Sequence, residues 1–243
     1  MRALEAVDLE LAAGAVHAII GPNGAGKTTL LNVLSGIYRP DAGAIHFDRQ
    51  DLTGRAPHEF AAAGIARTFQ NLQVFFNMSA LENVMAGGWL GARCTLASTL
   101  LHLPSFRQAE ERCRAMAERL LDDVGLSRWR DARADSMPYG ALKRLELARA
   151  LAAEPKLVLL DEPAAGLNAA ETREIDELIR RICARGITVV LVEHNMKLVM
   201  GVSDHVVVLD YGRKLADGDP RTVSADPRVI EAYLGPGATR AAA

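Results

Sequence analysis

The sequence predicts an α/β fold in which helices cover a mostly parallel sheet, with a helical lobe inserted in the middle of the chain. Two observations support this prediction. Four near-continuous apolar runs, at residues 16–20, 157–160, 187–192 and 206–209, have the composition of strands that are buried on both faces. Residues 71–154, in contrast, show little strand pattern and much helical periodicity.

A phosphate-binding pattern, G-x-x-x-x-G-K-T, joins the first predicted strand to a helix that is expected to begin at Thr28. Glycines let the backbone wrap closely enough for successive N–H groups to point inward, and the N-terminus of the next helix adds positive charge. Lys27 can reach the β- and γ-phosphates of a nucleotide, and the Thr28 hydroxyl can ligate Mg²⁺. A glycine-rich turn that matched by chance would not be expected between a strand and a helix. The predicted nucleotide-binding residues are Gly21, Pro22, Asn23, Gly24, Ala25, Gly26, Lys27, Thr28 and Thr29.

The middle of the chain is expected to be helical. Residues 110–124 predict an amphipathic helix, with apolar side chains on one side and arginine and glutamate on the other. Residues 91–107 are compatible with a helix, a loop or a partly mobile segment.

Two carboxylates, Asp161 and Glu162, directly follow the apolar run 157–160. The carboxyl ends of strands are where ligands bind in open α/β sheets. Asp161 is therefore expected to help hold Mg²⁺, and Glu162 to polarise an attacking water as general base. An isolated Asp-Glu pair would instead indicate a solvated strand end, and it is the phosphate loop that favours the catalytic interpretation.

The next predicted helix, Ala169–Ala184, provides the crossover that a parallel pair of strands at 157–160 and 187–192 requires. Gly186 is its expected stop signal. Its apolar residues at helical spacing are Ile175, Leu178, Ile179 and Ile182.

Composition excludes several classes of protein. The 243 residues, 49% of them hydrophobic, can form a sizeable core, and the formal net charge of −2 argues against a nucleic-acid binder. No signal peptide is visible, and no apolar run approaches the ~20 residues that span a bilayer. The three cysteines, Cys94, Cys113 and Cys183, have no metal-ligand spacing and are expected to be reduced thiols.

A resemblance to a known family is found in residues 137–151, MPYGALKRLELARAL. They resemble the signature motif of ABC-type ATPases, LSGGQ followed by a helix of the form R-x-x-[IL]-A-R-A-L. The helical half matches well, whereas the loop half retains only Gly140. In the family this loop binds the γ-phosphate of ATP that the opposite subunit holds. The resemblance therefore assigns ATP contacts to the backbone N–H groups of Tyr139, Gly140 and Ala141, since Pro138 lacks the usual serine hydroxyl.

Further segments match this family in the family's own order. Residues 68–71 resemble the Q-loop, so Gln70 is expected to contact Mg²⁺ and the attacking water. Residues 164–168 resemble the D-loop, with Asn168 where aspartate is usual, and residues 192–196 resemble the switch-histidine segment, so that His194 would contact the γ-phosphate. Alone, Gln70 would be a surface polar residue and His194 a strand-end histidine. The implied catalytic set is Glu162, His194 and Gln70, and the implied metal set is Thr28, Gln70 and Asp161.

The resemblance implies a P-loop NTPase (RecA-like) core with a mostly parallel sheet, a small antiparallel β part and an inserted α-helical subdomain. The chain is then a single ABC ATPase domain over residues 1–243. Within it, residues 1–70 and 155–220 form the nucleotide-binding α/β core, residues 71–154 the helical subdomain, and residues 221–243 a C-terminal tail.

The resemblance also implies a role, with ATP and Mg²⁺ as cofactors. The segments 67–71, 138–140, 166–168 and 231–235 look like the branch that energises importers of branched-chain amino acids, and importers of urea, amides or other amino acids share much of the pattern. The implied partners are permease membrane subunits, a second ATP-binding subunit of the same or another sequence, and indirectly a periplasmic solute-binding protein, with no nucleic acid. The implied location is peripheral, on the cytoplasmic face of the inner membrane. A non-transport ABC ATPase and a nucleotide-binding assembly module with little turnover are the alternatives from other classes.

One departure from the family concerns the N-terminus. ABC ATPases usually stack the adenine on an aromatic residue well upstream of the phosphate loop, whereas no aromatic residue precedes Tyr38 here. Losing such a contact weakens binding by roughly 0.5–1.5 kcal/mol, which is compatible with ATP binding. The departure leads us to expect a truncated or misassigned start.

Overall fold

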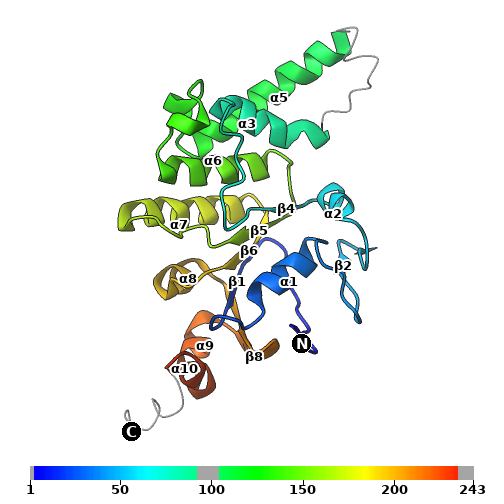
Figure 1. Ribbon diagram of the computed structural model, residues 1–243, viewed down its shortest axis with the longest axis vertical. Coiled ribbons are helices and arrows are strands. Elements are labelled where there is room, and N and C mark those ends of the chain that lie inside the picture. Colours follow the sequence, from blue (N-terminus) through cyan, green and yellow to red (C-terminus); the bar gives the residue numbers. More distant parts are fainter. Residues whose placement is uncertain (1–2, 92–103, 235–243) are drawn as a thin grey trace. The chain divides into compact units, whose positions relative to one another are not determined.

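The computed structural model describes residues 3–91 and 104–234, which form two compact units (Figure 1). The first unit comprises Met1–Gln70 and Lys156–Ala243, and the second comprises Asn71–Pro155. The boundaries expected from the sequence are 70/71 and 154/155, and those of the structure are 70/71 and 155/156.

The first unit is built on a six-stranded sheet with the order β4-β5-β6-β1-β7-β8. Its strands β4, β5, β6, β1 and β7 are parallel to their neighbours, and β8 pairs antiparallel with β7. The mostly parallel sheet is therefore confirmed. The strands are β1 (Val16–Ile20), β4 (Ile65–Arg67), β5 (Leu157–Asp161), β6 (Thr188–Val192), β7 (His205–Asp210) and β8 (Arg213–Gly218).

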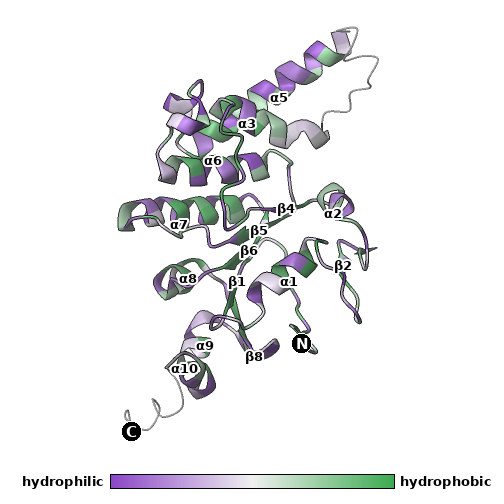
Figure 2. Cartoon of the chain, in the orientation of Figure 1, coloured by the Kyte–Doolittle hydropathy of each residue, from purple (hydrophilic) through white to green (hydrophobic). Residues whose placement is uncertain are grey.

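A small antiparallel pair, β2 (His46–Phe47) and β3 (Gln50–Asp51), forms a separate two-stranded sheet. Strands β1, β5 and β6 are buried along their whole length, because helices cover the large sheet. Figure 2 shows the apolar residues concentrated along these strands. The helices of this unit are α1 (Lys27–Leu34), α2 (Pro57–Ala63), α7 (Ala169–Ala184), α8 (Met196–Val202), α9 (Pro220–Ala225) and α10 (Pro227–Leu234).

Helix α7 has the bounds that the apolar spacing predicts, and its four apolar residues are buried. Its first turn is stabilised by Asn168, whose side-chain oxygen accepts the N–H groups of Ala170 at 2.9 Å and Glu171 at 3.1 Å. In place of the expected tail, residues 221–225 lie in α9 and residues 227–234 form α10, and residues 235–243 lie outside the described part.

The second unit is helical, as expected. Its two short 3₁₀ segments after α5 are η2 (Ser127–Trp129) and η3 (Ala134–Ser136). The other elements among its described residues are α3 (Ala80–Gly87), η1 (Gly88–Gly91), α5 (Pro104–Asp123) and α6 (Tyr139–Leu151). Helices α3 and α6 approach closely at Gly87, where a Cβ atom would lie 2.2 Å from the carbonyl oxygen of Arg149. Of the uncertain stretch 91–107, residues 104–107 belong to α5, and residues 92–103 lie outside the described part.

The stability of the first unit should fall as the pH drops below about 6.5, because His17 is buried within β1. Burial lowers the pKa of His17, and the bond to the Ala12 carbonyl only partly offsets this. The ring of His205, 5.7 Å away, lowers the pKa further, whereas the charges of Asp204 and Asp217 raise it. The unfolded chain then binds a proton on His17 at a pH at which the folded chain does not, so stability is present above the unfolded pKa and is lost as the pH falls through the folded pKa.

Urea unfolding between pH 7.5 and 5.0 would measure this dependence, and His17→Gln should flatten it. His58→Gln is the matched control, because His58 is exposed at the start of α2. An unchanged pH dependence in His17→Gln would assign the acid sensitivity to other groups.

Candidate functional site

The ends of four neighbouring parallel strands carry the residues that sequence analysis selected in the first unit. Across the sheet, Ile19 of β1 and Asp161 of β5 both pair with Val192 of β6, so these three strands end at one level. The phosphate loop follows β1, Glu162 follows β5, and His194 follows β6. Gln70 follows β4, which pairs with β5. The strand order therefore brings together segments that are far apart in the sequence.

The phosphate loop leaves β1 at Gly21 and enters α1 at Lys27. Gly21 has a φ of +150°, and a Cβ atom there would lie 2.1 Å from the carbonyl oxygen of Leu209, so only glycine fits. Gly26 caps α1 in the left-handed conformation. The turn between β7 and β8 supports the loop from the side, since the N–H of Gly212 donates to the Ala25 carbonyl at 3.0 Å.

Lys27 is buried, and its ammonium group donates to the carbonyl oxygens of Gly21 at 2.7 Å and Pro22 at 2.9 Å. Burial lowers the pKa of Lys27, and the carboxylates of Glu162 and Asp161 raise it in part. The carbonyl groups of the phosphate loop therefore bind the Lys27 ammonium group, which lies close enough to Glu162 and Asp161 for their charges to affect its pKa.

Asp161 is tied to Arg67, a residue of β4 to which sequence analysis gave no role. The Arg67 guanidinium donates to Asp161 Oδ2 at 3.0 Å, and the two side chains are only 7% and 6% exposed. Arg67 also donates to Asn32 Oδ1 at 2.7 Å and to Ser35 Oγ at 2.9 Å, both at the C-terminal end of α1. The planar fork of arginine suits such a junction, which joins β4, β5 and α1.

Both oxygens of Glu162 are engaged. His194 Nε2 lies 2.8 Å from Glu162 Oε1, and because a carboxylate only accepts, the histidine is the donor. Gln70 Nε2 donates to Glu162 Oε2 at 3.3 Å. The structure thus brings together three residues from three strand ends and orients the carboxylate between two donors. Each oxygen keeps a second lone pair that can accept a proton from water.

Glu162 has a φ of +50°, in the left-handed region that favours glycine. Such a conformation costs of order 1–3 kcal/mol and persists only where surrounding bonds enforce it. Here the Glu162 N–H donates to the Val192 carbonyl at 2.9 Å, and its own carbonyl accepts the Ala165 N–H at 3.1 Å. These two bonds hold the strained backbone of Glu162 in place at the C-terminal end of β5.

The signature-like segment lies in the second unit, where α6 begins at Tyr139. The N–H groups of Ala141 and Leu142 donate to the Pro138 carbonyl at 3.0 Å. The N–H groups of Tyr139 and Gly140 therefore lie in the first turn of the helix, where backbone donors point outward. Tyr139 is exposed, whereas Gly140 and Ala141 are buried.

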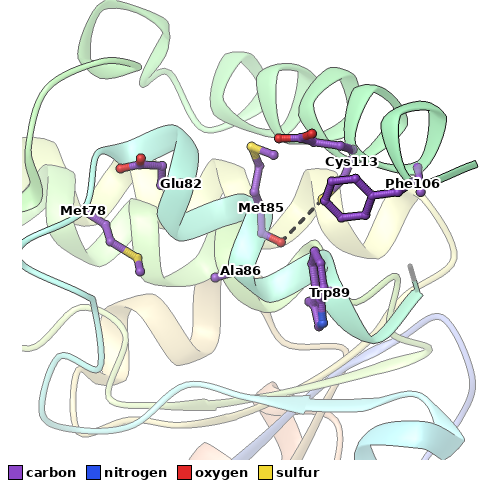
Figure 3. A pocket seen from close by; sticks show the side chains of 9 residues that line it. Met78, Glu82, Met85, Ala86, Trp89, Phe106 and Cys113 are labelled. Atoms are coloured by element: carbon purple, nitrogen blue, oxygen red, sulfur yellow. Dashed lines mark hydrogen bonds between the residues drawn. The ribbon is translucent and has the colours of Figure 1, made fainter. Parts of the chain in front are cut away.

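The second unit also carries an apolar pocket of about 430 Å³ between α3, η1 and α5 (Figure 3). Trp89, 54% exposed, lies opposite Phe106, and the Cys113 thiol donates to the Met85 carbonyl. The acidic residues Glu82 and Glu110 are also part of the lining. Cys113 and Cys183 are free thiols, and Cys94 lies outside the described residues.

Comparison with known proteins assigns the chain and its fold to a family. The family model described as ABC transporter matches residues 4–165, two thirds of the chain. The chain belongs to the ABC transporter family. Its members' ATP-binding cassettes are ATPases coupled to transport. A second model, described as a branched-chain amino acid ATP-binding cassette transporter, matches residues 213–235 of this ABC cassette.

Several curated relatives are similar over nearly the whole cassette. BraF of Pseudomonas aeruginosa is 41% identical and LivG of Escherichia coli K12 is 42% identical, each over 96% of this chain and 92% of its own length. Both are named high-affinity branched-chain amino acid transport ATP-binding proteins. LptB of Acidithiobacillus ferridurans, a lipopolysaccharide export system ATP-binding protein, is 38% identical over 94% of this chain and 89% of its own length.

Solved cassettes have the same fold. The ADP conformation of MJ1267, an ATP-binding cassette of an ABC transporter, aligns with a TM-score of 0.82 at 33% identity over 96% of this chain and 92% of its own. A dimeric cassette, MJ0796 bound to ADP and Pi, aligns with a TM-score of 0.76 at 25% identity over 90% of this chain and 91% of its own. Nucleotide binding is thus a property of this family. Within residues 3–91 and 104–234, no helix of the ABC cassette is long and apolar enough to cross a membrane.

Proposed function

We propose that the chain is the ATP-binding and ATP-hydrolysing subunit of an importer for branched-chain amino acids. The observation that carries the catalytic part is the Glu162 carboxylate held between His194 and Gln70, at the sheet edge where the phosphate loop begins. The solute is supported by the names of BraF and LivG and by the C-terminal model over residues 213–235.

Each residue of the site has a proposed role. The loop from Gly21 to Thr29 holds the phosphates through its N–H groups and Lys27. Glu162 accepts the proton of the attacking water, and His194 and Gln70 orient the Glu162 carboxylate. Tyr139 and Gly140 present the N–H groups at the start of α6 to the nucleotide of a second cassette, whereas the N–H of Ala141 is already bonded to the Pro138 carbonyl.

The oxygen donors fit Mg²⁺. Thr28, Gln70 and Asp161 offer hydroxyl, amide and carboxylate oxygens, which this hard cation prefers, and Arg67 leaves Asp161 one oxygen outside the ion pair. When bound with ATP, Mg²⁺ neutralises charge on the phosphates.

We also propose a single ABC ATPase domain, with residues 71–154 as its helical subdomain.

The proposed partners are permease membrane subunits, a second ATP-binding subunit, identical or paralogous, and indirectly a periplasmic solute-binding protein. The subunit would then lie on the cytoplasmic face of the inner membrane. The exposed apolar side chains of Trp89 and Met78 at the pocket of the second unit favour a protein partner there.

Lipopolysaccharide export is the second candidate, which the similarity to LptB favours. Import of branched-chain amino acids is the better supported of the two, because BraF and LivG are more similar and the C-terminal model carries that description. Uptake of labelled leucine by cells that lack the subunit tests the choice. Uptake restored by the wild-type chain is expected, and unchanged uptake would favour a different cargo.

ATP binding should be severely weakened in Lys27→Ala. The ammonium group makes charge-assisted hydrogen bonds worth about 1.5–3 kcal/mol, which corresponds to a loss of affinity of roughly 10- to 150-fold. Titration calorimetry with Mg-ATP measures this loss. Lys156→Ala is the control, because Lys156 is exposed and pairs with Asp48 in the same unit. Wild-type affinity in Lys27→Ala would contradict the role given to the phosphate loop.

A further inference from the structure

The carboxylate of Glu193 is buried beside the site and is not used by the chemistry proposed above. Its residue is 4% exposed, and it lies between the last residue of β6 and His194. Burying an ionised carboxylate is costly unless hydrogen bonds compensate for the lost water. The bonds that Glu193 makes therefore indicate why a carboxylate is placed there.

Three backbone N–H groups donate to Glu193. Oε1 accepts the N–H of Ala164 at 2.9 Å, and Oε2 accepts the N–H groups of His194 at 3.0 Å and Asn195 at 3.3 Å. Ala164 lies two residues after Glu162, in the loop that follows β5. One side chain thus binds the backbone of both segments that carry the Glu162–His194 pair.

The position of Glu193 along the strands explains why such a link is needed. The pairing of β5 with β6 ends at Asp161 and Val192, and the last backbone bond between them runs from the Glu162 N–H to the Val192 carbonyl. Beyond this point the sheet no longer joins the two segments. Glu193 continues the connection with charge-assisted bonds, which are roughly twice as strong as neutral ones.

We propose that Glu193 is a positioning residue for ATP hydrolysis, which acts by holding the loop of Glu162 and the segment of His194 in register. The inference rests on the proposed function, because it assigns Glu193 an effect on a reaction that Glu162 and His194 perform. It does not touch nucleotide, and its contribution lies in the alignment of the carboxylate that accepts a proton from water.

Steady-state and single-turnover hydrolysis of Mg-ATP by the full chain tests the proposal with Glu193→Gln. The amide keeps the size of the side chain but replaces one acceptor oxygen with a donor, so at least one backbone N–H loses its partner. A misplacement of about 1 Å can cost 100-fold in rate, so kcat should fall by about 10- to 100-fold. ATP affinity, which depends on the phosphate loop, should stay within about twofold of the wild-type value.

A double-mutant cycle separates positioning from a general structural effect. If Glu193 acts through Glu162, adding Glu193→Gln to Glu162→Gln should cause little further loss of kcat. Asp219→Asn is the matched control, because Asp219 accepts two backbone N–H groups at 3.0 Å at the start of α9 and has no part in the proposed chemistry. That variant should retain wild-type kcat.

Two results would overturn the proposal: a kcat within twofold of wild type in Glu193→Gln, or losses that multiply in the double variant. Should Glu193→Gln not fold, the same cycle is run with Glu193→Asp, which keeps the charge but withdraws it by about 1.5 Å, one C–C bond, from Ala164. Absence of hydrolysis by the wild-type chain assembled with its second cassette and permease subunits would overturn the proposed function itself, whereas wild-type hydrolysis with an unaffected Glu193 variant would overturn only the positioning role.

Discussion

Replacing Glu162 with glutamine should lower ATP turnover by about 10²- to 10⁴-fold, the usual contribution of a general base. Glutamine has nearly the same shape but cannot accept the proton that the attacking water must release. The local structure should persist, because the backbone bonds at Glu162 do not involve the side chain and the amide can still bond to one of its two present partners.

ATP affinity should be unchanged in Glu162→Gln, because the phosphate loop is intact. Single-turnover phosphate release and titration calorimetry on the same preparation measure the two quantities. Glu177→Gln makes the same chemical change on an exposed position of α7 and should leave both at wild-type values. If two cassettes close around ATP, size exclusion with Mg-ATP should also detect a trapped dimer of Glu162→Gln. Turnover equal to wild type would rule out Glu162 as the base.

Replacing Arg67 with alanine should reduce the free energy of unfolding by about 3–5 kcal/mol, the cost of breaking a buried ion pair from one side. The substitution leaves the carboxylate of Asp161, 6% exposed, without its guanidinium partner. It also removes the donors to Asn32 and Ser35, so three elements lose their common junction. Urea unfolding measures the loss.

The double variant Arg67→Ala/Asp161→Asn tests the electrostatic origin of this effect. Because the amide carries no charge, the double variant should be less destabilised than the sum of the two single variants predicts. Arg55→Ala is the control, since Arg55 forms an exposed pair with Glu59, and such pairs contribute about 0–1 kcal/mol. A loss below about 1 kcal/mol in Arg67→Ala would show that water or another group replaces the arginine.

Local patterns predicted much of the fold. The run Val16–Ile20 became β1, the apolar spacing gave both ends of α7, and the switch to helical periodicity marked the second unit. These features could be predicted because a buried strand and an amphipathic helix each show their pattern within a short window of consecutive residues. Sequence analysis did not predict helices α9 and α10, which have only 6 and 8 residues and therefore carry little periodic signal.

The sequence by itself determined the phosphate loop and the two carboxylates at the end of β5, because each consists of contiguous residues whose chemistry follows from their own spacing. Only the tertiary structure decided which side chains meet them. Arg67 reaches Asp161 across 94 residues of sequence, and Glu193 binds Ala164 across 29. Such partners are selected by the order of strands in the sheet, which places β4 beside β5 and β5 beside β6, and strand order is a long-range property that no local spacing encodes.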